Sequence, residues 1–280
     1  MSNSRRTRRS GEAHAIRRYS RRDFIRGGGS AVTLGMLAGA CGAWLPRGAD
    51  AQASAHGTDA VTILYPAQGA TFDLDYYRDH HLKLLSGVYG RAVERMELRR
   101  VVALPSSGGA PAAPPFSAAV NIWINDLGAF TAGGQKNAQA IADDMRKVTG
   151  ATPVIQFDKV YGEMGAARQV PQVGDRCLMM LYQNGDGVRW DVDKFRADHM
   201  PLIMKLYGPK AIKRFELRKG DHGMTQQSKP IFIGLVSIYV ASQDEMQAAG
   251  KQYASRLMAE EPTFSSVDPV VFPSFIHGIT

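Results

Sequence analysis

The stretch "FDLDYYRDHHLKLL" at residues 72–85 decides the fold, because it returns as "WDVDKFRADHMPLI" at residues 190–203. The positions that match without a gap are Phe72, Asp73, Asp75, Tyr77, His81 and Leu84, which correspond to Trp190, Asp191, Asp193, Phe195, His199 and Leu202. Farther along, "RMELRR" (95–100) returns as "RFELRK" (214–219). A repeat distance of about 117 residues is far longer than that of a solenoid, so the sequence indicates a duplicated domain.

Each copy predicts the order strand, helix, strand, strand, helix, strand. In the first copy, the predicted strands are residues 61–65, 93–104, 117–124 and 154–162. Asp73 is a predicted N-cap of the first helix and Gly90 ends it, while residues 127–147 form a second helix interrupted by Gly133-Gly134. In the second copy, the predicted strands are near 176–183, 211–219, 231–240 and 270–277, and the helices near 191–206 and 243–260.

This order is the ferredoxin-like arrangement, in which two helices cover one face of an antiparallel sheet. The other face of each sheet is expected to be apolar, and two copies can bury these faces against each other. The predicted fold class is therefore α+β, with two ferredoxin-like βαββαβ repeats that form an intramolecular dimeric α+β barrel. The two repeats form a pseudo-dimer within one chain, and whether such chains assemble into a further homo-oligomer stays open.

The first 53 residues are predicted to be a cleaved export signal. "SRRDFIR" (20–26) is a twin-arginine motif, a weakly apolar run follows it, and Ala49-Asp50-Ala51 suits a cleavage site. We expect the twin-arginine translocase to deliver the chain to the periplasm. Cys41 in "LAGACG" offers lipid anchoring as an alternative. The predicted domains are residues 54–164 and 175–280, joined by a linker at residues 165–174.

The charge of the leader accounts for the basic character of the whole chain. Removing residues 1–53 leaves 24 basic and 23 acidic residues, and the sequence has no basic stripe with interleaved aromatic residues. Nucleic-acid binding is therefore rejected. No long apolar run predicts a stable membrane span. Cys177 is the only cysteine after residue 53 and fits a small buried hydrophobe better than a nucleophile.

The conserved phase of the two histidines points to a site beneath the first helix of each copy. Helical spacing places Leu74, Tyr77, His81, Leu84 and Val88 on one stripe, and Val192, Phe195, His199, Leu202 and Leu206 on its counterpart. An imidazole in an apolar pocket exchanges protons near neutral pH. The candidate catalytic residues are His81, His199, Tyr77, Tyr65 and Tyr182. Because Phe195 lacks the phenol of Tyr77, the first copy is the better candidate.

The alternative for the histidines is a structural one, in which each buried imidazole is hydrogen-bonded to the backbone. Tyrosines are also common in cores when the hydroxyl finds a partner. The residues give no metal-ligand pattern, since Asp79, His80 and His81 point in different directions on a helix. "NGDG" (184–187) lacks the spacing of a dinucleotide-binding loop.

The residues "ILYPAQGATFDLDYYRDHHLKLL" resemble the opening of the EthD family, and "DHMPLI" is similar to its His-x-Pro-Leu ending. The first copy departs from that pattern at Lys83 and the second at Lys194-Phe195. The resemblance implies a dimeric α+β barrel and kinship with polyketide cyclases, dehydratases, muconolactone isomerases and haem-handling barrels. Some members of the family are labelled reductases.

We therefore expect an exported EthD-like protein that acts on a small apolar or aromatic carbonyl or phenolic compound in a degradation pathway. The expected chemistry is cofactor-independent acid/base catalysis of the cyclase, dehydratase or isomerase type. Two alternatives stay open: a haem- or small-ligand-binding barrel without turnover, and a family member of the reductase kind. No cofactor is predicted, and haem is the alternative.

Overall fold

The structure is a computed structural model that describes residues 58–67, 70–103, 113–165 and 171–280. The expected export signal, including the twin-arginine motif and Cys41, lies outside the described residues. Within the described part of the chain, no helix combines the length and the apolar character that a bilayer-spanning helix requires.

Both halves contain the six elements that the repeat predicts. The first half contains β1 (Asp59–Pro66), α3 (Leu74–Tyr76), η2 (Tyr77–His81), α4 (Leu82–Tyr89), η3 (Gly90–Ala92), β2 (Val93–Val101), β3 (Phe116–Ile124), α5 (Leu127–Lys136), α6 (Ala138–Val148) and β4 (Val154–Gly165). The second half contains β5 (Arg176–Gln183), α7 (Val192–Lys194), η4 (Phe195–His199), α8 (Met200–Ala211), β6 (Ile212–His222), β7 (Phe232–Val240), α9 (Gln243–Glu260), η5 (Glu261–Thr263) and β8 (Val270–Ile279).

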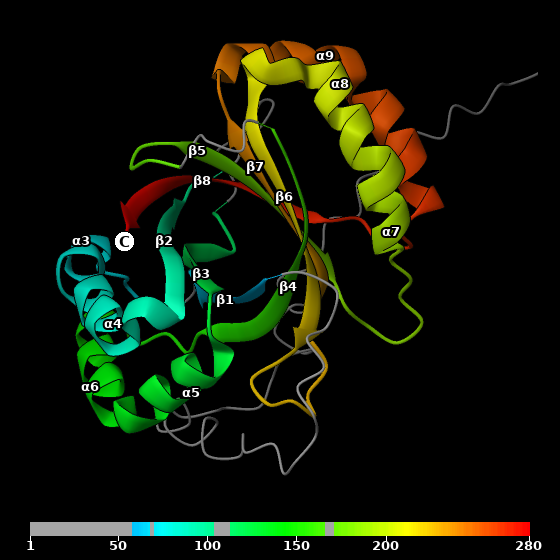
Figure 1. Cartoon of the computed structure of the whole chain (residues 1–280). Helices are drawn as coiled ribbons and strands as arrows, with labels where there is room; N and C mark the ends of the chain where they lie inside the picture. Colours follow the sequence, from blue (N-terminus) through cyan, green and yellow to red (C-terminus); the bar gives the residue numbers. More distant parts are fainter. Residues whose placement is uncertain (1–57, 68–69, 104–112, 166–170) are drawn as a thin grey trace, which may run out of the picture. The chain divides into compact units, whose positions relative to one another are not determined.

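The strands of the two halves close into one antiparallel barrel, in the order β1-β3-β2-β8-β5-β7-β6-β4 (Figure 1). Each half contributes a four-stranded sheet, and the edge strands pair across the halves as β2 with β8 and β4 with β6. Each strand of the described residues therefore has two neighbours, which removes the exposed edges that isolated sheets carry. The fold class predicted from the repeat is confirmed.

The first helix of each half begins as predicted but changes phase at its histidine. Asp73 accepts a hydrogen bond from the Tyr76 amide at 2.9 Å, and Asp191 does the same for Lys194. The segments η2 and η4 are single π turns. A π turn adds one residue to the turn, so the buried positions that follow the histidine move by one.

This phase change corrects part of the predicted apolar stripe. Leu82 and Leu85 are buried in the first half, whereas Leu84 is only partly buried. In the second half Ile203 is buried in place of Leu202. The predicted phase of Tyr77 and His81, which precede the change, is confirmed, because both are almost fully buried.

The second helix differs between the halves. In the first half α5 and α6 are separate helices that meet at Asn137, three residues after the predicted break at Gly133-Gly134. The second half has one uninterrupted helix, α9, with the bounds that the sequence predicts. Ser242 caps α9, since its hydroxyl accepts a hydrogen bond from the Glu245 amide at 3.4 Å.

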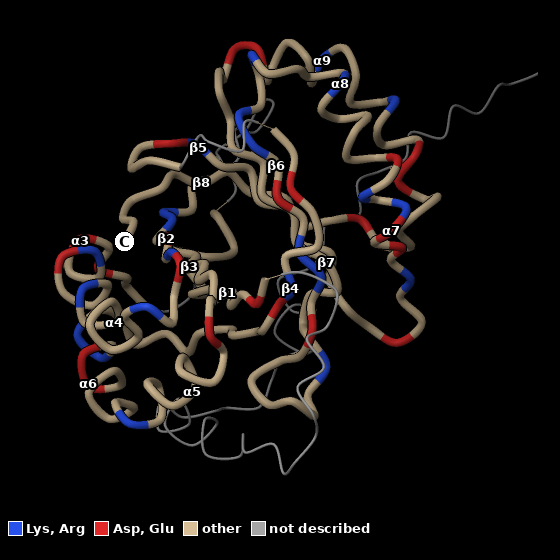
Figure 2. Tube along the Cα trace, in the orientation of Figure 1, with Lys and Arg blue, Asp and Glu red and all other residues tan. Residues whose placement is uncertain are grey.

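The barrel interior corrects the expectation of an apolar face. Along β2 the side chains of Met96 and Leu98 belong to the core under the helices, while Glu97 and Arg99 are fully buried on the opposite face. The repeat places Glu216 and Arg218 of β6 in the same way. Figure 2 shows charged positions on these strands as well as on the outer helices.

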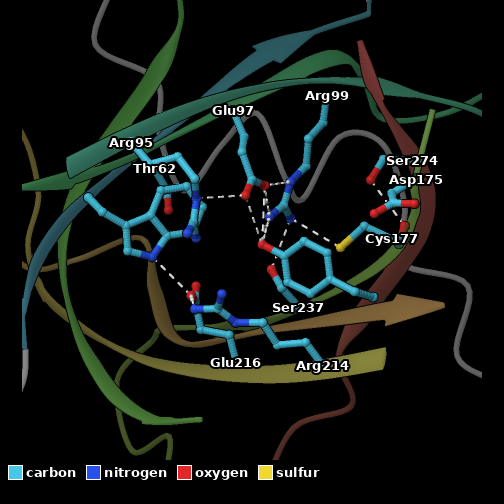
Figure 3. A network of polar contacts seen from close by, with 12 residues as sticks. Thr62, Arg95, Glu97, Arg99, Asp175, Cys177, Arg214, Glu216, Ser237 and Ser274 are labelled. Atoms are coloured by element: carbon cyan, nitrogen blue, oxygen red, sulfur yellow. Dashed lines mark hydrogen bonds and ion pairs between the residues drawn. The ribbon is translucent and has the colours of Figure 1, made fainter. Parts of the chain in front are cut away.

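Much of this interior network joins one half to the other (Figure 3). Arg99 donates to Glu97 at 2.7 Å, to Ser237 at 2.9 Å and to the Tyr239 hydroxyl at 2.7 Å. It also approaches the Cys177 sulfur at 3.2 Å, and burial raises the pKa of that thiol to about 11. Cys177 is thus a buried thiol in a polar setting.

A second group of contacts repeats this arrangement around Trp123. The guanidinium groups of Arg95 and Arg218 lie 3.8 and 4.3 Å from the centroid of its indole ring. The indole N–H donates to Glu216 of the other half at 2.9 Å. Asp158, fully buried nearby, has its pKa raised by burial to about 6. The closest ion pairs of the described interior lie within each half, and hydrogen bonds from Arg99 to Ser237 and Tyr239 and from Trp123 to Glu216 join the halves.

We predict that Glu97→Ala lowers the free energy of unfolding by about 3–5 kcal/mol, because it leaves the buried Arg99 without its carboxylate. Urea denaturation monitored by circular dichroism measures this loss. Asp186→Ala is the matched control, since Asp186 pairs with Lys229 on the exposed surface. That variant should keep the midpoint of the parent protein. Equal midpoints for the two variants would show that the network does not stabilise the barrel.

Candidate functional site

The candidate site is built around His81, which lies in the π turn η2 beneath the outer layer of the first half. Its side chain is 2% exposed, and its Nδ1 lies 2.9 Å from Oδ2 of Asp144 on α6. Asp144 also accepts hydrogen bonds from the Tyr76 hydroxyl at 2.8 Å and from Lys147 at 3.3 Å. The carboxylate therefore fixes one ring nitrogen, and Nε2 is the nitrogen left for other contacts.

Aromatic rings surround this imidazole. The ring centroid of Tyr77 lies 4.7 Å from that of His81 and 6.1 Å from that of Tyr65. Phe72 stacks on Tyr77 at 5.6 Å. The Tyr65 hydroxyl points to the sulfur of Met145 at 3.4 Å. The hydroxyl of Tyr77 is fully buried and faces the hydroxyl of Tyr65, and this contact raises the pKa of Tyr77 further.

A cavity of about 910 Å³, part of it open to solvent, lies between the sheet and the helices of the first half. Its lining comprises Val61, Ile63, Tyr65, Tyr77, His81, Leu85, Tyr89, Ile122, Phe130, Thr131, Gly134, Ile141, Met145, Pro153, Ile155, Phe157 and Met224. Among these described residues none is Asp, Glu, Lys or Arg. An apolar cavity with a few convergent polar groups is typical of small-molecule sites.

Burial and hydrogen bonds together set the protonation states at the site. Burial lowers the pKa of His81, and the hydrogen bond and charge of Asp144 offset part of that shift. Burial alone would raise the pKa of Asp144, but hydrogen bonds from Tyr76, His81 and Lys147 outweigh it and hold the pKa below its ordinary value. Burial raises the pKa of Tyr77 well above its usual range. At neutral pH the site thus holds a neutral imidazole, a carboxylate and a neutral phenol.

The second half repeats the histidine and its carboxylate with a looser contact. Nδ1 of His199 lies 3.5 Å from Oε2 of Glu260 on α9. Burial lowers the pKa of His199, and Glu260 opposes the shift. Lys194 stands where the first half has Tyr76, so Glu260 lacks the phenol that holds Asp144.

Aromatic side chains occupy the space beside His199. The ring of Phe264 lies 4.6 Å from the His199 ring and meets Phe195 edge-on at 5.0 Å. The bridge between Trp190 and Ser265 is the repeat equivalent of the bridge between Phe72 and Thr149. Phe264, which precedes Ser265, therefore corresponds to Val148, which precedes Thr149. An aromatic ring thus lies against His199 where the first half has the smaller side chain of Val148.

Tyr182 occupies the position of Tyr65 but is in different surroundings. It is fully buried, and its ring lies 5.4 Å from that of Trp190. Burial raises the pKa of Tyr182 well above its usual range, and the nearby Glu261 raises it further. Burial likewise raises the pKa of Glu261 to about 7.

The structure thus brings Tyr65, Tyr77 and His81 together in one cavity and places Tyr182 and His199 in the other half. Sequence reasoning missed Asp144 and Glu260. A usable signal existed, because these two acids occupy matching positions in the second helix of the two copies. Met224 reaches the first-half cavity from the second half. It lies outside the repeated segments 72–85 and 190–203, so the repeat gave no signal for it.

Haem fits the lining only in part. His81 backed by Asp144 suits an axial ligand, since such a partner fixes the ring and raises its basicity. The described lining, however, offers no cationic side chain for the two carboxylates of haem. The residues present therefore favour an uncharged ligand. Within the described part of the chain, no three His, Cys, Asp or Glu side chains are grouped as metal ligands would be.

No protein-family model matches the chain, and no curated protein matches it. Solved structures with a similar fold include an EthD-like protein from Ralstonia eutropha, at 19% identity over 37% of this chain and 93% of that one, with a TM-score of 0.35. An anthrone oxidase-like protein covers 81% of this chain and 94% of its own at 9% identity and a TM-score of 0.45. A dye-decolorizing peroxidase from Bacteroides thetaiotaomicron covers 79% and 94% at 8% identity and a TM-score of 0.40. Such similarities assign no activity to this chain.

We predict that His81 titrates with a pKa below 6.5 and that Asp144→Asn lowers this pKa further, because the substitution removes the charge that favours the imidazolium. NMR of the histidine ring protons against pH measures both values. Asp143→Asn is the matched control, because the neighbouring Asp143 pairs with the exposed Arg146 instead. A His81 pKa above 6.5, or a rise in the Asp144→Asn variant, would contradict the assigned pairing.

Proposed function

We propose that the first-half cavity binds a small apolar or aromatic molecule with a carbonyl or phenolic oxygen and catalyses proton transfer on it. His81 is the general base and Tyr77 the hydrogen-bond donor to the oxygen. The reaction is of the isomerase or lyase type. The observation that carries the proposal is the oriented, neutral imidazole of His81 beside the facing hydroxyls of Tyr77 and Tyr65 in an apolar cavity.

The proposed step follows from these protonation states. Nε2 of His81 takes a proton from the carbon next to the substrate carbonyl, and the C–H electron pair forms a carbon–carbon double bond. The carbonyl π electrons move to oxygen, where the Tyr77 hydroxyl donates a hydrogen bond. Asp144 stabilises the imidazolium, which returns the proton to another carbon in an isomerisation or to a leaving hydroxyl in a dehydration.

Tyr65 and the surrounding rings orient the substrate in this proposal. The high pKa of Tyr77 keeps it protonated, so it donates and does not act as a base. His199 and Tyr182 support the fold of the second half, where Phe264 fills the space beside the imidazole. The retained His199–Glu260 pair is then a remnant of the duplication.

The proposed export to the periplasm and the proposed role in a degradation pathway rest on the sequence. The twin-arginine motif and the small-residue cleavage site support export to the periplasm, and the EthD-like motif supports a role in degradation of small organic compounds. A reductase reaction would need a hydride donor, for which the sequence offers no dinucleotide-binding motif.

The test is exchange of the protons next to a carbonyl in deuterium oxide. We expect the protein to accelerate this exchange in 2-tetralone, a small aromatic ketone, as followed by proton NMR. His81→Gln should reduce the acceleration about 10²–10⁴-fold, the usual contribution of a general base. Tyr77→Phe should reduce it less, because it removes one hydrogen bond from the developing oxyanion.

His199→Gln is the matched control and should keep the parental rate. An acceleration that survives in the His81→Gln variant would place the chemistry elsewhere. Exchange at the buffer rate in the parent protein would reject proton abstraction from ketones of this class.

A further inference from the structure

The cavity of the first half is completed by a segment of the second half. The register of β4 with β6 pairs Phe157 with His222, and their rings stack with centroids 4.6 Å apart. Phe157 lines the cavity, and Met224, two residues after His222, lines it too. Met224 also packs against the core of the first half. The cross-half strand pairing thus carries this segment to the other half's site.

The loop that presents Met224 is held by its own hydrogen bonds. The Gly223 amide donates to the Ser228 carbonyl at 2.9 Å, and the Ser228 hydroxyl donates to the Thr225 carbonyl at 2.6 Å. A Cβ on Gly223 would lie 2.6 Å from the Ser228 hydroxyl oxygen, so a larger residue there would displace this hydroxyl from its hydrogen bond to Thr225. These hydrogen bonds hold the loop that presents the partly buried Met224 to the cavity.

Methionine suits such a position because it is unbranched, flexible and polarisable, and it makes favourable contacts with aromatic rings. The rest of the described lining belongs to the first half. Met224 is the one residue of the described lining that belongs to the second half. It can therefore be substituted without changing His81, Tyr77 or Asp144.

We propose that Met224 sets the size of the ring system that the cavity accepts, so that the second half determines the specificity of the site in the first. This inference rests on the proposed function for the ligand class, which is a neutral aromatic compound with one oxygen. Through this one side chain the second half contributes to the site of the first half.

The test compares dissociation constants of 2-naphthol and 2-anthrol, which differ by one ring, by titration calorimetry. Met224→Ala should shift the preference toward 2-anthrol by about tenfold, in line with the discrimination that a few methylenes give in an apolar pocket. Met224→Leu keeps the volume and should keep the parental preference. Met258→Ala is the matched control, because Met258 is 60% exposed, and it should change nothing. Near-UV circular dichroism checks that each variant is folded.

The outcomes separate the two proposals. If the parent protein binds neither compound, the ligand class is wrong and the proposed function fails with it. If the parent binds and the Met224→Ala variant shows the parental preference, the proposed function stands and the role of Met224 is rejected. An equal shift in the Met258→Ala variant would also reject it.

Discussion

The pairing of edge strands across the two halves is the constraint on which the rest of the structure depends. Each four-stranded sheet alone would leave two edges unpaired, and joining β2 to β8 and β4 to β6 removes all of them. Closure turns the helix-free faces inward and places Glu97 and Glu216 where only arginine, tyrosine and tryptophan partners of both halves satisfy them. The same pairing brings Met224 to the cavity of the first half.

One motif, used twice, serves two purposes in this chain. Both halves keep a π turn, a buried histidine and a carboxylate on the following helix. The first half keeps the Tyr77 phenol beside a cavity, whereas the rings of Phe195 and Phe264 pack together at the equivalent place of the second half. Duplication lets one copy keep the chemistry proposed here while the other stabilises the barrel and shapes the wall of the site.

The sequence predicted the fold well because the repeat, the strand and helix order and the cap at Asp73 are local signals. It predicted the burial of His81 with Tyr77 for the same reason. The phase change after His81 was not predictable, because apolar residues stand in both phases: Leu84 and Val88 in the predicted one, and Leu82 and Leu85 in the observed one. The charged barrel interior was missed because Glu97 and Arg99 alternate with apolar residues as they would on a solvent-facing strand. Asp144 and Met224 reach the site only through tertiary packing.

The tautomer of His81 tests the account most directly. With the ionised Asp144 accepting from the ring, the account predicts that at pH 8 the proton resides on Nδ1 and that Nε2 carries the free lone pair. Long-range proton–nitrogen NMR correlations of the ¹⁵N-labelled imidazole distinguish the two forms. A His81 ring protonated on Nε2, or one that averages freely between the two tautomers, would contradict the proposed base.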